Sequence, residues 1–119
     1  MVDHDAVRRI AMALPGVEER ASYGGRPSWR TPARMFTWIR DDPEALVLWV
    51  DSVEERDALI AAEPGTFFTT PHYDGEAIVL ARLDPLDEQE ATELITDSWR
   101  LRAPKRQVAA FDAAGGLTP

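Results

Sequence analysis

Apolar residues recur with a helical period near the N-terminus. The stripe falls at positions i, i+3, i+4 and i+7 and consists of Val7, Ile10, Ala11 and Leu14. This spacing places its members on one side of an amphipathic helix. Asp3 or Asp5 can cap the helix, because a short carboxylate accepts hydrogen bonds from the free amides of a first turn. Pro15-Gly16 ends it, since proline cannot continue a helix and glycine permits the turn.

Three short segments are predicted to be strands, namely Ser28 to Thr31, Met35 to Arg40 and Ala45 to Val50. The turns between them, at Pro32-Ala33 and at Asp41 to Glu44, are of hairpin length, so we expect antiparallel pairing. The third segment is apolar on both faces, which predicts a central place in the sheet. The preceding stretch, Val17 to Gly25, is interpreted as a polar connector.

Alternation along the second of these segments assigns its side chains to two faces. One face receives Phe36, Trp38 and Arg40. The other receives Met35, Thr37 and Ile39. We expect this alternation to hold along the whole strand.

Two later helices are marked by their start signals. Ser52 and Glu55 have the spacing of a capping box, in which each side chain bonds the other's free amide. The helix that they open stops before Pro64-Gly65. Asp87 with Glu90 begins the last long helix. Its buried stripe is predicted to be Ala91, Leu94, Ile95 and Ser98.

The remaining apolar segments complete the predicted fold. Phe67-Phe68 and the run Ala77 to Leu83 predict one or two further strands, and a short helical piece is predicted after Pro104. The order is therefore αβββαββα, an α+β two-layer sandwich with helices on an antiparallel sheet of about five strands. Residues 1–112 are predicted to form a single domain and residues 113–119 a flexible C-terminal tail.

Composition narrows the class of protein. The 119 residues are enough for one domain with one core, and the absence of cysteine excludes disulfides, thiolate metal sites and a cysteine nucleophile. No apolar run reaches the roughly 18 residues of a membrane span. Met1 to Asp5 lacks the basic start of a signal peptide, so a cytoplasmic location without membrane association is predicted. The formal net charge of -8 would repel a polyanion unless basic residues cluster locally.

The loop Thr69 to Gly75 concentrates reactive side chains between apolar segments. In an extended conformation, Thr70, His72 and Asp74 would share one face, as a hydroxyl, a base and an acid. The alternative is an ordinary turn reversed by Asp74-Gly75. No partner ligands, second nearby histidine or glycine-rich phosphate loop accompany them. We therefore predict a protein that is not an enzyme, with no catalytic residue, no metal and no cofactor.

Aromatic residues offer a possible binding cleft. The four tryptophans, Trp29, Trp38, Trp49 and Trp99, are expected mainly to share the core. Trp29 is the expected exception, because it lies near Gly24-Gly25 and flanking arginines. The predicted cleft consists of Tyr23, Trp29, Thr70, His72 and Tyr73. Such a cleft would take a small molecule or a protein.

Basic residues cluster in two places. The first hairpin carries Arg26, Arg30 and Arg34, and the end of the third helix carries Arg100, Arg102, Lys105 and Arg106. Cations near a helix C-terminus also offset its dipole, so the second cluster has a structural explanation as well. Either cluster could contact phosphate.

Several segments, in order, resemble the MmcQ/YjbR-like family. They are Ala11 to Glu19, Arg34-Met35-Phe36, the Asp51 to Ala62 helix with Arg56 to Leu59 at its centre, and Leu94 to Trp99 leading to Ala103 to Arg106. The resemblance extends from about Asp5 to Ala110. It implies a compact α+β domain with an antiparallel sheet, and it implies DNA binding, because members are commonly described as DNA-binding through a double-wing-like fold.

Two hypotheses follow. The first is weak DNA binding through the two arginine clusters. The second is a binding module for a small molecule or a protein that uses the aromatic cleft. Neither the oligomeric state nor a physiological ligand follows from the sequence.

Overall fold

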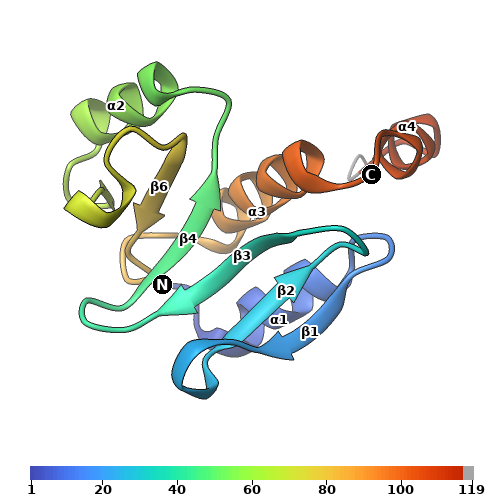
Figure 1. The fold of residues 1–119 in the computed structure, drawn as a ribbon, viewed down its shortest axis with the longest axis horizontal. Helices are drawn as coiled ribbons and strands as arrows, with labels where there is room; N and C mark the ends of the chain where they lie inside the picture. The colour runs from blue at the N-terminus through green and yellow to red at the C-terminus, as the bar shows by residue number, and fades with distance from the viewer. Residues whose placement is uncertain (117–119) are drawn as a thin grey trace.

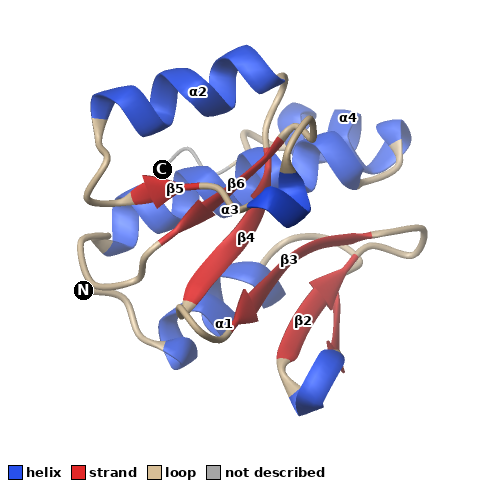
Figure 2. Cartoon of the chain, turned by 60° about the vertical axis from the view of Figure 1, so that its left-hand side comes forward, coloured by secondary structure: helices blue, strands red, loops and turns tan. Residues whose placement is uncertain are grey.

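Six antiparallel strands form one open sheet in the computed structural model, which describes residues 1–116 apart from the side chain of Tyr23. The strand order is β1-β2-β3-β4-β6-β5, so β4 lies near the centre (Figures 1 and 2). The strands are β1 (Glu18–Ala21), β2 (Pro27–Arg30), β3 (Met35–Arg40), β4 (Ala45–Trp49), β5 (Phe67–Phe68) and β6 (Ile78–Ala81). The predicted α+β class with an antiparallel sheet is confirmed.

Two helices, α1 (His4–Met12) and α3 (Glu88–Arg102), cover one side of this sheet. The elements are α1 (His4–Met12), α2 (Val53–Ala62), α3 (Glu88–Arg102) and α4 (Lys105–Ala113), with two 3₁₀ turns, η1 (Tyr23–Gly25) and η2 (Pro71–Tyr73). Figure 1 looks onto the sheet with α1 and α3 behind it. Of the predicted tail 113–119, residues 117–119 lie outside the described part of the chain. No helix within residues 1–116 combines the length and apolarity needed to cross a membrane.

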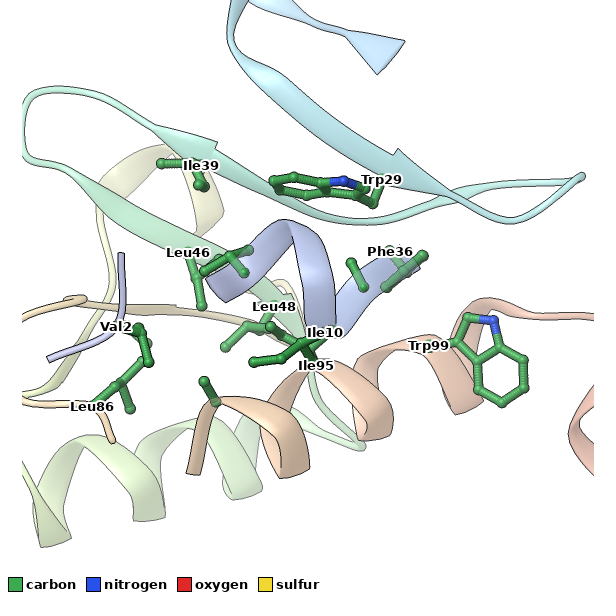
Figure 3. Packing of buried hydrophobic residues seen from close by; sticks show 14 of the residues in the cluster. Val2, Ile10, Trp29, Phe36, Ile39, Leu46, Leu48, Leu86, Ile95 and Trp99 are labelled. Atoms are coloured by element: carbon green, nitrogen blue, oxygen red, sulfur yellow. The ribbon is translucent and has the colours of Figure 1, made fainter. Parts of the chain in front are cut away.

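The hydrophobic core lies between the sheet and the pair α1 and α3 (Figure 3). Its largest fully buried side chains include Trp29, Phe36, Ile39, Leu46, Leu48, Ile95 and Trp99. On the opposite side, no α-helix of the described residues covers β3 and β4 (Figure 1). We call that side the open face.

The helices begin as their sequence signals predict. Asp3 caps α1 by accepting a hydrogen bond from the Ala6 amide at 2.8 Å. Asp87 and Glu90 form the complete capping box of α3. At α2 only the Ser52 half of the predicted box is formed, with the hydroxyl accepting from the Glu55 amide at 3.0 Å.

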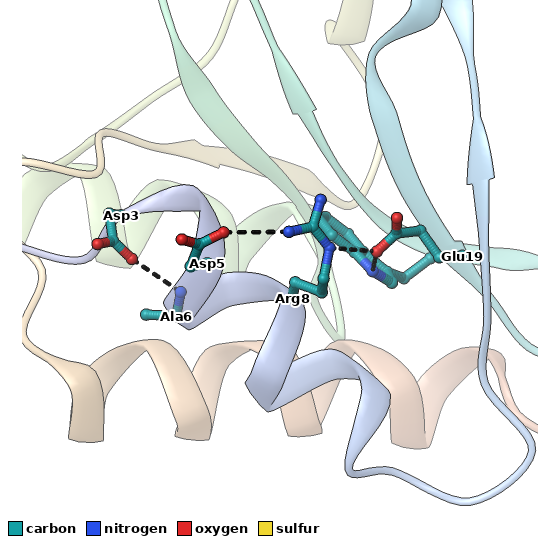
Figure 4. A network of polar contacts seen from close by, with 6 residues as sticks. Asp3, Asp5, Ala6, Arg8 and Glu19 are labelled. Carbon is teal, nitrogen blue, oxygen red and sulfur yellow. Dashed lines mark hydrogen bonds and ion pairs between the residues drawn. The ribbon is translucent and has the colours of Figure 1, made fainter.

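Strand β1 corrects the interpretation of Val17 to Gly25 as a connector throughout. Its residues are all exposed, so they carry no apolar alternation by which a strand could be predicted. Tertiary contacts hold it instead. Glu19 accepts hydrogen bonds from the buried Trp29 indole at 3.0 Å and from Arg8 of α1 at 2.8 Å. Arg8 also contacts Asp5, so one network links α1 to the edge of the sheet (Figure 4).

A β-bulge corrects the predicted faces of β3. Trp29 lies opposite Thr37 and Arg30 opposite Met35, which leaves Phe36 as an extra residue in β3. Phe36 therefore turns into the core, although strict alternation would place it beside Trp38. Met35 moves to the open face for the same reason. The buried volume that Phe36 fills decides its direction, and the sequence pattern does not contain that information.

Candidate functional site

The open face carries a shallow groove lined by arginines. The arginine groove consists of Arg20, Ala21, Ser22, Ser28, Arg30, Ala33, Arg34, Met35 and Arg102. Three strands and the end of α3 therefore contribute to it. Arg102 is held in place by its side chain, which donates to the Met35 carbonyl at 3.0 Å. Burial lowers the pKa of Arg102, and the positive charge of Arg34 lowers it further.

Two of these guanidinium groups have no partner among the described side chains. There, neither Arg30 nor Arg34 makes a side-chain hydrogen bond or ion pair, whereas Arg20 pairs loosely with Glu18 at 3.5 Å. Arg34 is exposed and Arg30 is half-buried. A guanidinium presents five donors in a planar fork that fits a phosphate or carboxylate. These two groups are therefore available to an external anion.

A second groove of about 620 Å³ lies beside the first. We call it the aromatic groove; it consists of Ser22, Arg26, Met35, Trp38, Arg40, Asp41, Val47, Trp49, His72, Tyr73 and Ile78. Its strand residues come from β3, β4 and β6, so the open face itself forms the floor. Trp38 and Trp49 are half-buried there. The volume lies within the range of about 300–1,000 Å³ that is usual for ligand sites.

The wall of the aromatic groove is the turn η2, which a buried arginine fixes to α2. Arg56 is 5% exposed, and one of its guanidinium nitrogens donates to the carbonyls of Tyr73 at 3.2 Å and Glu76 at 3.0 Å. His72 packs edge-on against Tyr73, with 4.8 Å between ring centroids. Partial burial raises the pKa of the Tyr73 phenol, an effect that the nearby charge of Arg40 opposes.

The same turn corrects the extended arrangement considered for Thr70, His72 and Asp74. Residues 71–73 form a 3₁₀ turn, so alternate side chains do not share a face there. His72 is exposed and lies beside Tyr73. No group of three or more potential metal-ligating side chains converges anywhere in the part of the chain that the structure describes.

The two grooves form one continuous surface. Ser22 and Met35 line both, and the Arg102 guanidinium of the arginine groove lies over the Trp49 ring of the aromatic groove, 4.3 Å from its centroid. Six arginines line this surface: Arg20, Arg26, Arg30, Arg34, Arg40 and Arg102. Among the described residues that line it, Asp41 is the single carboxylate, and it pairs with Arg26.

The residues of the two predicted basic clusters are grouped differently in the structure than along the sequence. Arg26, Arg30 and Arg34 of the hairpin lie on the open face together with Arg102. Arg100 instead pairs with Asp112 and lines a groove between α2 and α3. Lys105 and Arg106 are exposed on α4 and line neither groove of the open face.

The predicted cleft is also rearranged. His72 and Tyr73 line the aromatic groove, but Trp29 is fully buried on the opposite face of the sheet, so its assignment to a cleft is wrong. Its indole bonds Glu19, which explains why it needs no solvent. Thr70 is half-buried and lines neither groove, and the side chain of Tyr23 lies outside the described residues.

Three important groove residues were not predicted, namely Trp38, Arg40 and Trp49. Alternation already placed Trp38 and Arg40 on one face of β3. Only the position of the helices shows that this face is open, since α1 and α3 both lie on the other side. For Trp49, the apolar residues on both faces of β4 predicted complete burial, so nothing in the sequence indicated that this side chain lines a groove.

A third groove, of about 430 Å³, lies between α2 and α3 and has the opposite charge. We call it the acidic groove; its carboxylates are Asp51, Glu55, Glu63, Glu90, Glu93 and Asp97. Arg100 is the one cation among its described lining residues. Burial raises the pKa of Asp97, Arg100 opposes that rise, and Asp51 and Glu93 reinforce it. Trp49 lines both the acidic and the aromatic groove.

Comparisons with known proteins identify relatives of this chain. The uncharacterized proteins Rv2570 of Mycobacterium tuberculosis and Mb2600 of Mycobacterium bovis are each 38% identical over 133 residues, covering 98% of this chain and 100% of theirs. The crystal structure of Deinococcus radiodurans protein DR2400, with a DUF419 domain, shares the fold at a TM-score of 0.69 and 24% identity. That likeness covers 82% of this chain and 75% of that one. The model of the YjbR family matches residues 12–101, so the chain belongs to the YjbR family.

Proposed function

We propose that this protein binds DNA through the open face of its sheet. The observation that carries the proposal is the concentration of six arginines around two adjoining grooves in a chain whose net charge is -8. Phosphate contacts by such side chains supply most of the sequence-independent affinity for DNA. The role proposed for the open face is binding, and no catalytic step is assigned to His72.

Local charge outweighs net charge at such short range. Salt screens charges beyond about 8 Å at physiological ionic strength, so a phosphate in the arginine groove interacts mainly with the groove itself. The acidic groove lies between α2 and α3. DNA on the open face would therefore be attracted by the arginines in contact with it. The acidic remainder would weaken binding, chiefly at low salt.

Arg30 and Arg34 are the side chains best suited to make the phosphate contacts. They have no internal partner within the described residues, so binding a phosphate would not require an existing ion pair to break. Arg26 is engaged by Asp41, and Arg102 by the Met35 carbonyl and the Trp49 ring. Arg26 and Arg102 therefore shape the grooves. Arg30 and Arg34 are free to move toward the ligand.

Fluorescence anisotropy with labelled DNA, both duplex and single-stranded, tests the proposal. We expect binding that weakens steeply between about 50 and 200 mM salt. Replacing Arg30→Ala or Arg34→Ala should lower affinity about threefold to tenfold at low salt and reduce the salt slope by about 1 each. Arg9→Ala controls for the loss of one positive charge, because Arg9 is an exposed arginine on α1, behind the sheet, where it pairs with Glu88.

Two results would contradict DNA binding. One is no detectable complex with either form of DNA at low salt. The other is an equal loss of affinity in Arg9→Ala and Arg34→Ala, which would show that only net charge matters. A protein that used the aromatic groove for an uncharged small molecule would show neither the salt slope nor the arginine dependence.

A further inference from the structure

The arginine groove carries a positive charge that no neighbour balances. Its cations are Arg20, Arg30, Arg34 and Arg102, and none of the described residues that line it is a carboxylate. Glu18, which contacts Arg20 loosely at 3.5 Å, is not one of the lining residues. Like charges gathered in one groove repel one another, so the groove favours a ligand that brings negative charge into it.

The four guanidinium groups are attached around one pair of residues. Arg30 lies opposite Met35 in the pairing of β2 with β3. Arg34 directly precedes Met35, and the Arg102 side chain donates to the Met35 carbonyl at 3.0 Å. Arg20 of β1 pairs with the residue two positions before Arg30 on β2. Cations spaced along one element would follow the backbone of a nucleic acid, whereas cations from several elements around one point surround a single anionic group.

Two of these arginines stand at the ends of a hydrogen-bonded turn. The Thr31 amide donates to the Arg34 carbonyl at 2.8 Å, and the buried Thr31 hydroxyl accepts from the Arg34 amide at 3.0 Å. The backbone between Arg30 and Arg34 is therefore fixed, while their guanidinium groups have no partner among the described side chains. Both groups can turn toward one ligand without breaking an existing contact.

The charges of the groove also act on one another. Burial lowers the pKa of Arg102, and the charge of Arg34 lowers it further, so these two guanidinium groups lie within electrostatic reach. A phosphodiester inside a DNA strand carries a single negative charge. A phosphate monoester carries about 1.5 to 2 negative charges at neutral pH and offers three acceptor oxygens. The monoester therefore neutralises more of the groove and accepts from more of its guanidinium donors.

We propose that the arginine groove binds a phosphate monoester at the end of a DNA strand, with Arg30 and Arg34 donating to its oxygens and Arg20 and Arg102 beside them. This inference rests on the DNA binding proposed above and specifies which part of the DNA this groove holds. Arg40, which lines the aromatic groove and not the arginine groove, is left to contact internal phosphates.

The test compares DNA strands of about 12 nucleotides that differ only at the 5′ end. That end carries a hydroxyl, a phosphate monoester or the methyl ester of the same phosphate, and a fluorescent label is placed at the 3′ end. The monoester should bind about tenfold more tightly than the hydroxyl, and the methyl ester should stay within about threefold of the hydroxyl because it lacks the second charge. A second set, with the phosphate at the 3′ end and the label at the 5′ end, shows which end is recognised, and discrimination in either set supports the inference.

Two arginine variants locate the recognition. Arg34→Ala should reduce the preference for the monoester over the hydroxyl from about tenfold to about twofold, because it removes one of the two free guanidinium groups. Arg40→Ala is the matched control, since it removes another arginine of the open face from outside the arginine groove. It should weaken the binding of all strands alike and keep the preference. A preference that fell equally in both variants would overturn the assignment to this groove.

The remaining outcomes separate this inference from the proposed function. Equal affinity for the hydroxyl and monoester strands in both sets would overturn the inference and leave salt-dependent DNA binding standing. Equal affinity for the monoester and its methyl ester would overturn it as well, because the second charge would then play no part. Absence of binding to every strand would overturn both proposals. If Arg34→Ala fails to fold, as judged by circular dichroism, the comparison of the strands with the wild-type protein still decides the question.

A free nucleotide carries the same chemical group as a strand end. Deoxyadenosine 5′-monophosphate, added as a competitor of the labelled monoester strand, distinguishes the two sources. It should compete much more weakly than an unlabelled phosphorylated strand, because it offers no internal phosphates to the rest of the open face. Equal competition would assign the groove to a free nucleotide and overturn the strand end as its ligand.

Discussion

The open face and the acidic groove are neighbouring surfaces with opposite chemistry. Among the described residues, six arginines and one carboxylate line the two grooves of the open face, whereas six carboxylates and one arginine line the groove between α2 and α3. Trp49, at the end of β4, lines a groove on each side. Both surfaces are built on the same central strand, so their difference comes from what surrounds that strand.

The comparison shows how little a net charge says about local binding. The carboxylates of the acidic groove include residues in the first turns of α2 and α3, where acidic side chains favour the helix dipole. The arginines of the open face come mainly from strands and their turns. A net charge of -8 is therefore compatible with a cationic surface, because helix starts and sheet residues lie in different places.

Charge reversal should give the largest difference in DNA affinity between variants of the open face and variants of the acidic groove. The double variant Arg30→Glu with Arg34→Glu should lower DNA affinity about 100-fold or more, because it removes two cations and adds two anions at the proposed contact. The reverse change in the acidic groove, Glu63→Lys with Glu93→Lys, should raise affinity at most about threefold at low salt and not at all near 0.15 M, where screening is strong. Anisotropy titrations at two salt concentrations measure both. Comparable effects of the two double variants would break the distinction.

Replacing Ser98 of α3 tests whether its hydrogen bonds stabilise the backbone of β3 and β4 between the open face and the acidic groove. Its buried hydroxyl donates to the Phe36 carbonyl at the bulge, at 2.5 Å, and accepts from the Trp49 amide at 2.9 Å. Ser98→Ala would leave both backbone groups without this partner, so we expect a loss of about 1–3 kcal/mol in the free energy of unfolding. Urea denaturation measures it.

The control for this substitution lies on the same helix. Thr92→Ala removes a hydroxyl that donates only to the Glu88 carbonyl of α3, which is already a helical backbone group. That change should stay within about 0.5 kcal/mol of wild type. If Ser98→Ala were equally mild, the bulge and the end of β4 would be held by packing alone.

The smallest expected effect concerns the pH dependence of the acidic groove. The pKa of Asp97 is raised in the folded state, first by burial and then by Asp51 and Glu93, so the folded protein holds this proton more tightly than the unfolded chain. Ionising Asp97 therefore costs stability, and this cost is absent below the ordinary pKa near 3.8 and complete above the raised value. Asp97→Asn should be more stable than wild type at pH 7 and should lose that advantage as the pH falls from the raised pKa to the ordinary one.

Solvent limits the size of this gain. Asp97 is an exposed residue, so we expect a gain of no more than about 0.5 kcal/mol. Asp84→Asn, at an exposed site outside the acidic groove, controls for the loss of one negative charge. Thermal unfolding of the three proteins between about pH 3 and 7 makes the comparison. A stabilisation by Asp97→Asn that persisted unchanged at low pH would contradict the assignment.

The sequence by itself determined the elements whose signals are local. The period of Val7 to Leu14, the capping signals (Asp3 or Asp5, and Asp87) and the hairpin turns after β2 and β3 led to the correct helices and strand pairings. Each of these signals depends on residues a few positions apart, so short-range hydrogen bonding and side-chain periodicity suffice to predict it. The α+β class follows from their order.

Only the tertiary structure decided the site. Strand β1 has no apolar alternation and exists because β2 and the Arg8–Glu19–Trp29 network hold it. The bulge at Phe36 moves Met35 to the open face, and Arg102 reaches Arg34 across 68 positions of the chain. These outcomes depend on how volumes fill one core and on which face the helices leave uncovered. Such long-range balances are set by the whole fold, and no window of the sequence contains them.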